Sequence, residues 1–164
     1  MIFVTVGTHE QQFDRLVTYM DKWAAEHDEE VIIQTGYSTV EPVNCKWQKF
    51  FLKSEMNDFI SSARIVITHG GPSCYIDVLE HGKIPVVVPR RRQFGEHVDD
   101  HQYEIGLRLK EFRNNIIFIE DIEKLGQAIA DYDELIKGMN NSTPQTLNDA
   151  FCDEFSKRID RLFE

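Results

Sequence analysis

The sequence is short of cysteine and of long apolar runs. Its three cysteines are far apart and form no CxxC pair, so we expect neither a disulfide framework nor a structural zinc site, and a reducing cytosol is the natural compartment. No apolar run approaches the roughly 20 residues that cross a bilayer, and the first residues carry no basic leader of a signal peptide. These absences predict a cytoplasmic chain.

Positive charge is also scarce. Lys and Arg total 18 against 28 Asp and Glu, which gives a formal net charge of -10. Since a nucleic-acid backbone demands a cationic surface, nucleic acid is not expected as a partner. No GxxxxGK[ST] loop occurs, which excludes ATP hydrolysis of the Walker type. The 164 residues are 41% hydrophobic and 28% charged, a composition typical of one globular domain with a substantial core.

Short apolar runs alternate with stretches of helical periodicity. Strands are predicted at 2–6, 31–33, 65–67, 86–88 and 116–119, with a further short strand within 47–52. Helices are predicted at 11–25, from Ser54 as N-cap, at 73–81 and at 97–110. Because the strand runs are apolar throughout, they predict a mainly parallel sheet covered on both faces. The expected fold is a single Rossmann-like α/β domain over residues 1–139.

The segment after this domain has a different pattern. Residues 140–144 (Asn-Asn-Ser-Thr-Pro) interrupt the alternation. Beyond them, apolar residues recur at every fourth position: Leu147, Phe151, Phe155, Ile159 and Phe163. This spacing predicts an amphipathic helix within 140–164. The helix either packs on its own domain or docks on another subunit.

Three predicted strands end in segments that suit an anionic ligand, at 7–9, 69–72 and 90–92. Ligands of parallel sheets bind at the carboxyl ends of strands. In the segment 68–73 (THGGPS), two glycines permit a tight turn and Pro72 suits the first helical position. The N–H groups of Ser73 and Cys74 would then face a phosphate at the positive end of the helix dipole. A glycine turn required only for packing remains the alternative.

Two further residues extend this predicted phosphate site. Asp77 shares the helix face of Ser73 and Cys74, where its carboxylate suits ribose hydroxyls; otherwise it only favours the helix dipole. Gly7 and Thr8 can cradle a diphosphate with backbone and hydroxyl donors. His9, the next residue, either contacts the ligand or caps the following helix.

The densest polar stretch is 90–102. Three consecutive arginines, Arg90, Arg91 and Arg92, suggest an anionic ligand or partner in so acidic a chain, and a solvated basic loop is the alternative. His97 and His101 are four residues apart on a predicted helix, a spacing that zinc accepts, yet no distant third ligand stands out. Binding of sugar hydroxyls explains these residues more simply, and no metal is expected.

Three segments together resemble a known family: MIFVTVGTHEQQFDRLV, THGGPSCYIDVLEHGKIPVVVPRRR and GEHVDDHQ. They look like the C-terminal domain of family 28 glycosyltransferases, and more closely like the free-standing small subunit of two-chain enzymes. Among these, the subunits of bacterial capsule and exopolysaccharide glycosyltransferases are nearest. The resemblance spans residues 1–102 and implies the donor-binding half of a GT-B fold.

The resemblance also implies a UDP-sugar site. Its binding residues would be Gly7, Thr8, His69, Gly70, Gly71, Ser73, Cys74, Asp77, Arg90, Arg91, Glu96, His97, Asp100, His101 and Gln102. Asp77 stands where the family usually has the ribose-binding Glu. His9 is the local candidate for the general base, which otherwise belongs to a partner chain.

The resemblance further implies an inverting hexosyl transfer from a UDP-sugar to a lipid-linked saccharide, without an essential metal or other cofactor. The acceptor-binding half would be a membrane-associated subunit, which would hold this chain at the inner face of the cell membrane. Two alternatives remain open. The chain could be a non-catalytic enhancer of such a transferase, or an unrelated nucleotide-binding regulator with a flavodoxin-like sheet.

Overall fold

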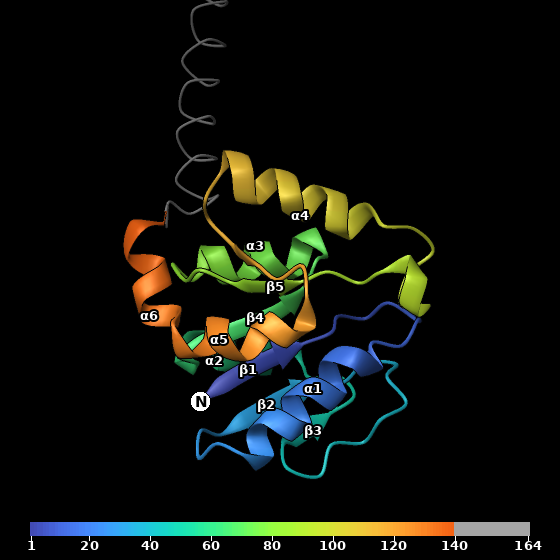
Figure 1. The fold of residues 1–164 in the computed structure, drawn as a ribbon. Coiled ribbons are helices and arrows are strands. Elements are labelled where there is room, and N and C mark those ends of the chain that lie inside the picture. Colours follow the sequence, from blue (N-terminus) through green and yellow to red (C-terminus); the bar gives the residue numbers. More distant parts are fainter. Residues whose placement is uncertain (140–164) are drawn as a thin grey trace, which may run out of the picture.

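Six parallel strands form one sheet in the computed structural model, which describes residues 1–139. The strands are β1 (Ile2–Thr5), β2 (Val31–Gln34), β3 (Lys46–Gln48), β4 (Ile65–His69), β5 (Val86–Val88) and β6 (Ile117–Phe118). They lie in the order β3-β2-β1-β4-β5-β6 (Figure 1), and every adjacent pair is parallel. The predicted Rossmann-like α/β domain is confirmed. The apolar runs are buried on both faces, as such a sheet requires.

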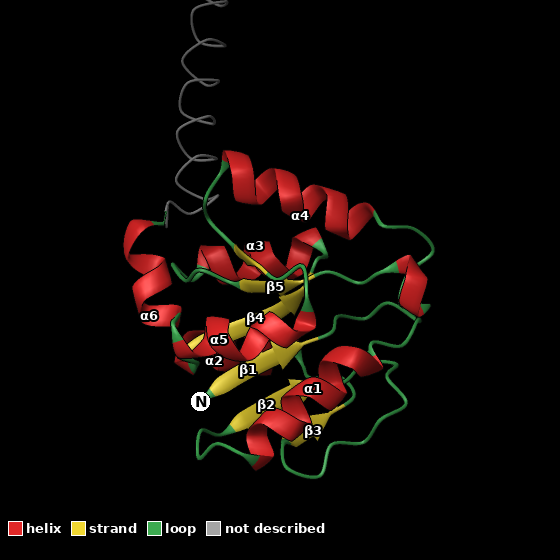
Figure 2. Cartoon of the chain, viewed as in Figure 1, coloured by secondary structure: helices red, strands yellow, loops and turns green. Residues whose placement is uncertain are grey.

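Two layers of helices cover the sheet. The helices are α1 (Asp14–Ala25), α2 (Lys53–Ser62), α3 (Pro72–Glu80), α4 (His101–Phe112), α5 (Leu125–Ala130) and α6 (Tyr132–Leu135). In Figure 2, α1 and α5 lie in front of the sheet and α2 and α3 lie behind it. Successive residues of β1 serve the two layers, because side chains alternate along a strand. Val4 joins the core cluster beneath α1, whereas Phe3 packs with Ile60 and Val78 on the α2 and α3 side.

Helix α4 lies closest to the edge strand β6. Gly106 faces Phe118 so closely that a Cβ atom at Gly106 would overlap the phenyl ring. The glycine therefore permits the close approach of helix and strand. Helices α5 and α6 follow β6, in a region where the sequence analysis places no element. No helix within residues 1–139 is long and apolar enough to span a membrane. The apolar stripe predicted from Leu147 to Phe163 lies outside the described residues.

Three predicted helix starts differ from the structure. Helix α1 begins at Asp14 rather than at 11. Helix α4 begins at His101 rather than at 97, because residues Arg92–Phe94 form a short 3-10 turn that ends at Gly95 with a φ of 66°. His97 therefore precedes the helix, and His97 and His101 do not share a helical face. Ser54 is not the N-cap of α2; Leu52 occupies that position, and its N–H donates to the Glu55 carboxylate at 2.7 Å.

Candidate functional site

A hollow of about 500 Å³ lies at the carboxyl ends of β1, β2 and β4. It is lined by Thr5, Gly7, Thr8, His9, Gln34, Phe51, Lys53, Met56, His69, Gly71, Ser73, Cys74 and Gln102. The predicted loops at 7–9 and 69–74 therefore meet at one edge of the sheet. They meet because β1 and β4 are hydrogen-bonded neighbours, with Thr5 paired to Thr68.

The imidazole of His69 separates the two glycine loops. His69 is the last residue of β4 and only 7% exposed. A Cβ atom on either Gly7 or Gly71 would overlap its ring. Gly7 also has a φ of 76°, a conformation that favours glycine. The two loops need glycine because they close over a buried side chain.

His69 is held in its neutral form. Burial lowers the pKa of His69 from 6.5 to about 3, and the nearby Arg90 cation acts in the same direction. Its Nδ1 atom is buried and has no hydrogen-bond partner among the described residues. A buried polar atom without a partner is uncommon in folded proteins. This unpartnered atom belongs to a side chain that lines the hollow.

The low pKa of His69 predicts a pH effect on stability. The unfolded chain binds a proton at His69 below about pH 6.5, whereas the folded chain does so only near pH 3. The stability contributed by neutral His69 is thus complete above pH 6.5 and decreases as the pH falls toward 3, by at most about 1.4 kcal/mol per pH unit. Urea denaturation of wild type and His69→Gln from pH 7 to pH 4 measures it. Parallel pH profiles of the two proteins would contradict the prediction.

The first turn of α3 faces the hollow. Pro72 is the first helical residue, as predicted, and Gly71 is its N-cap. Within residues 1–139, the N–H groups of Thr8, Gly71 and Ser73 have no acceptor. The sequence predicts that the Cys74 N–H faces a phosphate. In the structure this N–H instead donates to the Gly71 carbonyl at 3.1 Å. These unpaired donors stand at the positive end of the helix dipole, an arrangement that favours an anion.

Gln102 links the loop after β4 to the loop after β5. Its Oε1 accepts the N–H of Gly70 at 3.1 Å and the N–H of Arg90 at 3.1 Å. These bonds fix Oε1 as the acceptor and leave Nε2 for other contacts. Gln102 reaches the hollow, whereas Gly70 packs directly against the Gln102 side chain. Gly70 thus shapes the loop without lining the hollow.

Arg90 is placed in the interior and not at the hollow. It is fully buried, and its guanidinium donates to four backbone carbonyls, those of Val6 (2.8 Å), Gln11 (2.8 Å), Gln12 (2.9 Å) and Glu96 (3.1 Å). Burial lowers its pKa to about 10, which leaves it charged at neutral pH. The sequence predicts that Arg90 contacts the ligand. The structure differs, because Arg90 is fully buried and does not line the hollow. Arg90 joins the β1–α1 loop to the β5–α4 loop, which lie side by side in Figure 1.

Neighbouring charged residues of this loop are also paired within the protein. Glu96 is fully buried, and its carboxylate accepts two hydrogen bonds from Arg15, both at 2.9 Å. Arg91 donates from Nε to Asp100 at 2.9 Å, and its guanidinium lies 3.9 Å from the Tyr103 ring centroid. Glu96, Asp100 and Arg91 therefore hold the loop in shape, and none of the three lines the hollow.

His9 and His97 come together, although 88 positions separate them in the sequence. Their ring centroids are 4.8 Å apart. His9 Nδ1 accepts the Gln11 N–H at 3.2 Å, and His97 Nδ1 lies 2.9 Å from the Asp99 carboxylate. Burial lowers the pKa of His9, as do His97 and Arg90. His101 is exposed, and its backbone N–H donates to the Asp99 carboxylate at 3.1 Å. No group of three or more possible metal ligands occurs within residues 1–139.

Asp77 does not line the hollow directly. Its carboxylate pairs with Lys53 Nζ at 2.6 Å, and Lys53 does line the hollow. Five residues of the lining are not predicted from the sequence: Thr5, Gln34, Phe51, Lys53 and Met56. The signal that was available is position, because Lys53 opens the helix that follows the predicted strand within 47–52.

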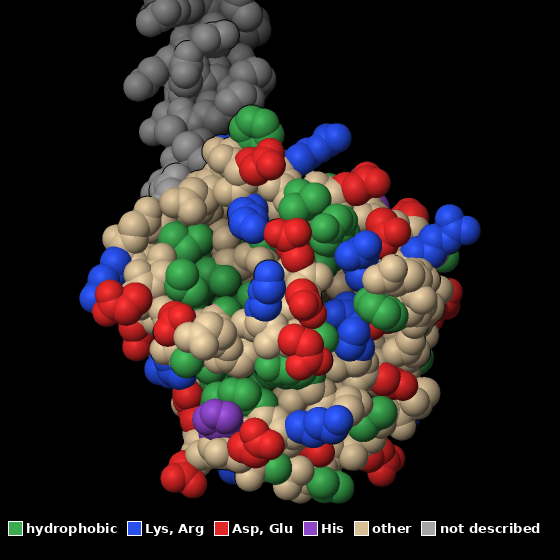
Figure 3. All heavy atoms as spheres, in the orientation of Figure 1, with side chains coloured by type: hydrophobic (Ala, Val, Ile, Leu, Met, Phe, Trp, Pro, Cys, Tyr) green, Lys and Arg blue, Asp and Glu red, His purple; other side chains and the backbone are tan. Residues whose placement is uncertain are grey.

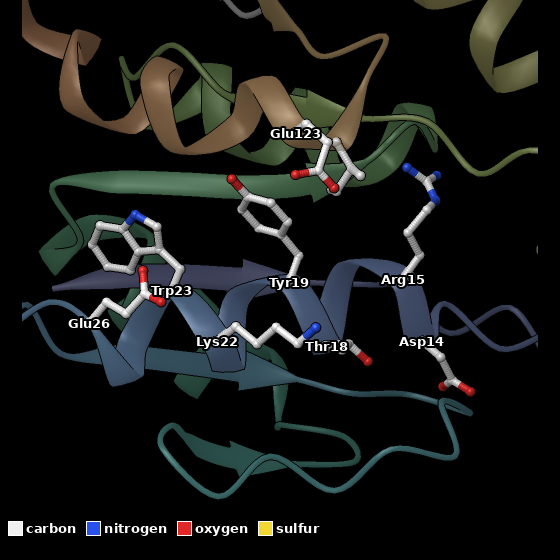
Figure 4. Close-up of a pocket in the computed structure, with 9 residues that line it drawn as sticks. Asp14, Arg15, Thr18, Tyr19, Lys22, Trp23, Glu26 and Glu123 are labelled. Atoms are coloured by element: carbon white, nitrogen blue, oxygen red, sulfur yellow. The ribbon is translucent and has the colours of Figure 1, made fainter.

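A second hollow of similar volume, about 540 Å³, lies along α1 (Figure 4). Three of its polar side chains are already paired: Asp14 accepts from Thr39, Arg15 binds Glu96, and the Tyr19 hydroxyl accepts the Gly126 N–H at 3.0 Å. On the face in Figure 3, acidic and basic side chains are interspersed. The hollow at the carboxyl edge of the sheet is the stronger candidate. Of the two hollows, this one is lined by residues whose backbone N–H groups have no acceptor and by the buried His69.

Comparison with a solved structure gives the same architecture. The chain is similar to CalG4, the calicheamicin glycosyltransferase, with a TM-score of 0.56 and 14% identity over 96% of this chain and 43% of that chain. It is also similar to the glycosyltransferase SnogD from Streptomyces nogalater, with a TM-score of 0.49 and 16% identity over 92% of this chain and 42% of that one. The chain thus spans about two fifths of the length of these proteins. No curated protein matches its sequence.

The sequence itself decides the family. Residues 1–158, nearly the whole chain, match the glycosyltransferase family 28 C-terminal domain. The six-stranded parallel sheet agrees with this match, since it is consistent with the Rossmann-like half of GT-B glycosyltransferases. The chain therefore belongs to the family of the glycosyltransferase family 28 C-terminal domain.

Proposed function

We propose that the hollow at the carboxyl edge binds a UDP-sugar and that the chain is the donor-binding part of a glycosyltransferase. The observation that carries this proposal is the set of unpaired N–H groups of Thr8, Gly71 and Ser73 around the neutral His69. A diphosphate offers the acceptors that these donors lack. Family membership supports glycosyl transfer as the reaction.

The proposed reaction is an inverting transfer. An acceptor hydroxyl attacks the anomeric carbon, a general base takes the hydroxyl proton, and UDP leaves as its bond to that carbon breaks. The unpaired N–H groups and the α3 dipole stabilise the negative charge on the departing diphosphate. The proposal requires no metal ion for this task.

We assign the general base to a partner chain rather than to His9. The Nδ1 atom of His9 accepts the Gln11 N–H, so neutral His9 carries its hydrogen on Nε2. It could accept a proton only after releasing that bond, and its lowered pKa also disfavours protonation. The partner would supply the acceptor-binding half, as a membrane-associated subunit that presents a lipid-linked saccharide in capsule or exopolysaccharide synthesis.

Calorimetric titration with UDP, ADP and a panel of UDP-sugars tests the donor assignment. We expect UDP to bind more tightly than ADP, and one UDP-sugar to exceed UDP alone. Hexosyl transfer to a lipid-linked acceptor is then assayed with and without the membrane subunit, and we expect transfer only with both. Equal affinity for UDP and ADP would favour a general nucleotide-binding regulator. Undiminished transfer by the pair after substitutions within 70–77 would favour a non-catalytic enhancer.

A further inference from the structure

The positive charge that would balance a diphosphate does not come from the three arginines. Arg90 is enclosed by four carbonyl groups, and Arg91 is engaged by Asp100 and Tyr103. Arg92 is exposed on the short turn after β5 and does not line the hollow. Since a diphosphate carries at least two negative charges at neutral pH, its cation must come from elsewhere.

Lys53 is the one lysine or arginine among the described residues that line the hollow. It is the first residue of α2, so its backbone stands at the carboxyl edge of the sheet, after β3. The other titratable side chains of the lining do not supply a permanent cation. His69 is neutral, the pKa of His9 is lowered by burial, and burial raises the pKa of the Cys74 thiol.

Asp77 holds Lys53 in place across the gap between α2 and α3. Lys53 Nζ lies 2.6 Å from Asp77 Oδ2, and the side chains are 65% and 31% exposed. An exposed ion pair of this kind is weak, and a lysine stem is flexible. The ammonium can therefore turn from Asp77 to a ligand at little energetic cost. Its release would also free the Asp77 carboxylate, for which the sequence predicts ribose hydroxyls.

We propose that Lys53 supplies the positive charge that balances the diphosphate of the bound nucleotide, and that Asp77 holds its ammonium at the mouth of the hollow until the ligand arrives. The proposal rests on the proposed function, because it assumes a nucleoside diphosphate at this edge of the sheet. Lys53 is then a binding residue, and it stabilises UDP both as ligand and as leaving group.

Titration of Lys53→Met with UDP and with uridine tests the proposal. We expect UDP affinity to fall about tenfold, a typical effect of one charge-assisted hydrogen bond, while uridine affinity stays unchanged because uridine lacks phosphate. Lys53→Arg should retain most of the UDP affinity. Lys49→Met is the matched control, since it removes the same charge from an exposed residue outside the hollow. It should bind UDP as wild type does.

Three outcomes separate the possible failures. If Lys53→Met binds UDP as tightly as wild type, the Lys53 ammonium does not stabilise the bound diphosphate and the inference is overturned. If UDP and uridine weaken equally, Lys53 is only a structural link between α2 and α3, which also overturns it. If wild type binds no UDP, the proposed function fails instead. The salt dependence gives a second readout, since UDP binding by Lys53→Met should weaken less with added salt than that of Lys49→Met.

Discussion

Arg90→Met is expected to lower the free energy of unfolding by about 3–5 kcal/mol. Arg90 is the largest fully buried side chain within residues 1–139. Methionine keeps much of its apolar volume but removes the donors to the carbonyls of Val6, Gln11, Gln12 and Glu96. A buried carbonyl left without a donor costs about 1–3 kcal/mol. Urea denaturation followed by circular dichroism measures the change.

Arg92→Met is the matched control for this prediction. Arg92 is exposed, so its replacement should change the free energy of unfolding by no more than about 0.5 kcal/mol. Both variants lose one arginine charge from the same loop. The difference between their free energies of unfolding therefore reports the effect of removing a buried rather than an exposed arginine. If Arg90→Met proves as stable as wild type but binds UDP poorly, Arg90 contacts the ligand, as the sequence alone suggests.

Gly71→Ala is expected to cost about 2 kcal/mol of stability and to abolish UDP binding. Gly71 has a φ of -74°, which alanine adopts without strain. The obstacle is the His69 ring, which the new Cβ atom would overlap. Crowding of this kind costs about 1–3 kcal/mol in packed interiors. The displaced loop would also misdirect the N–H groups at the start of α3. Thermal unfolding and UDP titration measure the two effects.

A second substitution, at His69, tests whether the His69 ring causes the loss of stability in Gly71→Ala. In His69→Ala/Gly71→Ala the ring is absent, so part of the stability lost in Gly71→Ala should return. The corresponding rescue of Gly7→Ala should be smaller, because alanine at a φ of 76° is strained whatever surrounds it. Strict additivity of the His69 and Gly71 substitutions would show that the ring is not the obstacle.

Much of the fold could be predicted from the sequence, because its signals are local. The apolar runs at 2–6, 31–33, 65–67 and 86–88 predict buried parallel strands without knowledge of their neighbours, and the sheet contains all four. The start of α3 at Pro72 was equally predictable, since the ring of proline suits a first helical position. The start of α4 was not, because the Arg91–Asp100 contact and the left-handed Gly95 interrupt the periodicity.

The sequence by itself determined a Rossmann-like domain, its family, and which loops stand at the carboxyl edge of the sheet. Only the tertiary structure decided which side chains of those loops are available. Arg90 and Lys53 are both cations after a strand, yet Arg90 turns inward to four carbonyls, whereas Lys53 lies at the lining of the hollow with its ammonium on Asp77. The direction of a side chain depends on acceptors far away in the sequence, such as the Val6 carbonyl, 84 positions from Arg90. Local patterns carry no information about such partners, because the strand order that brings them together arises only when the chain folds.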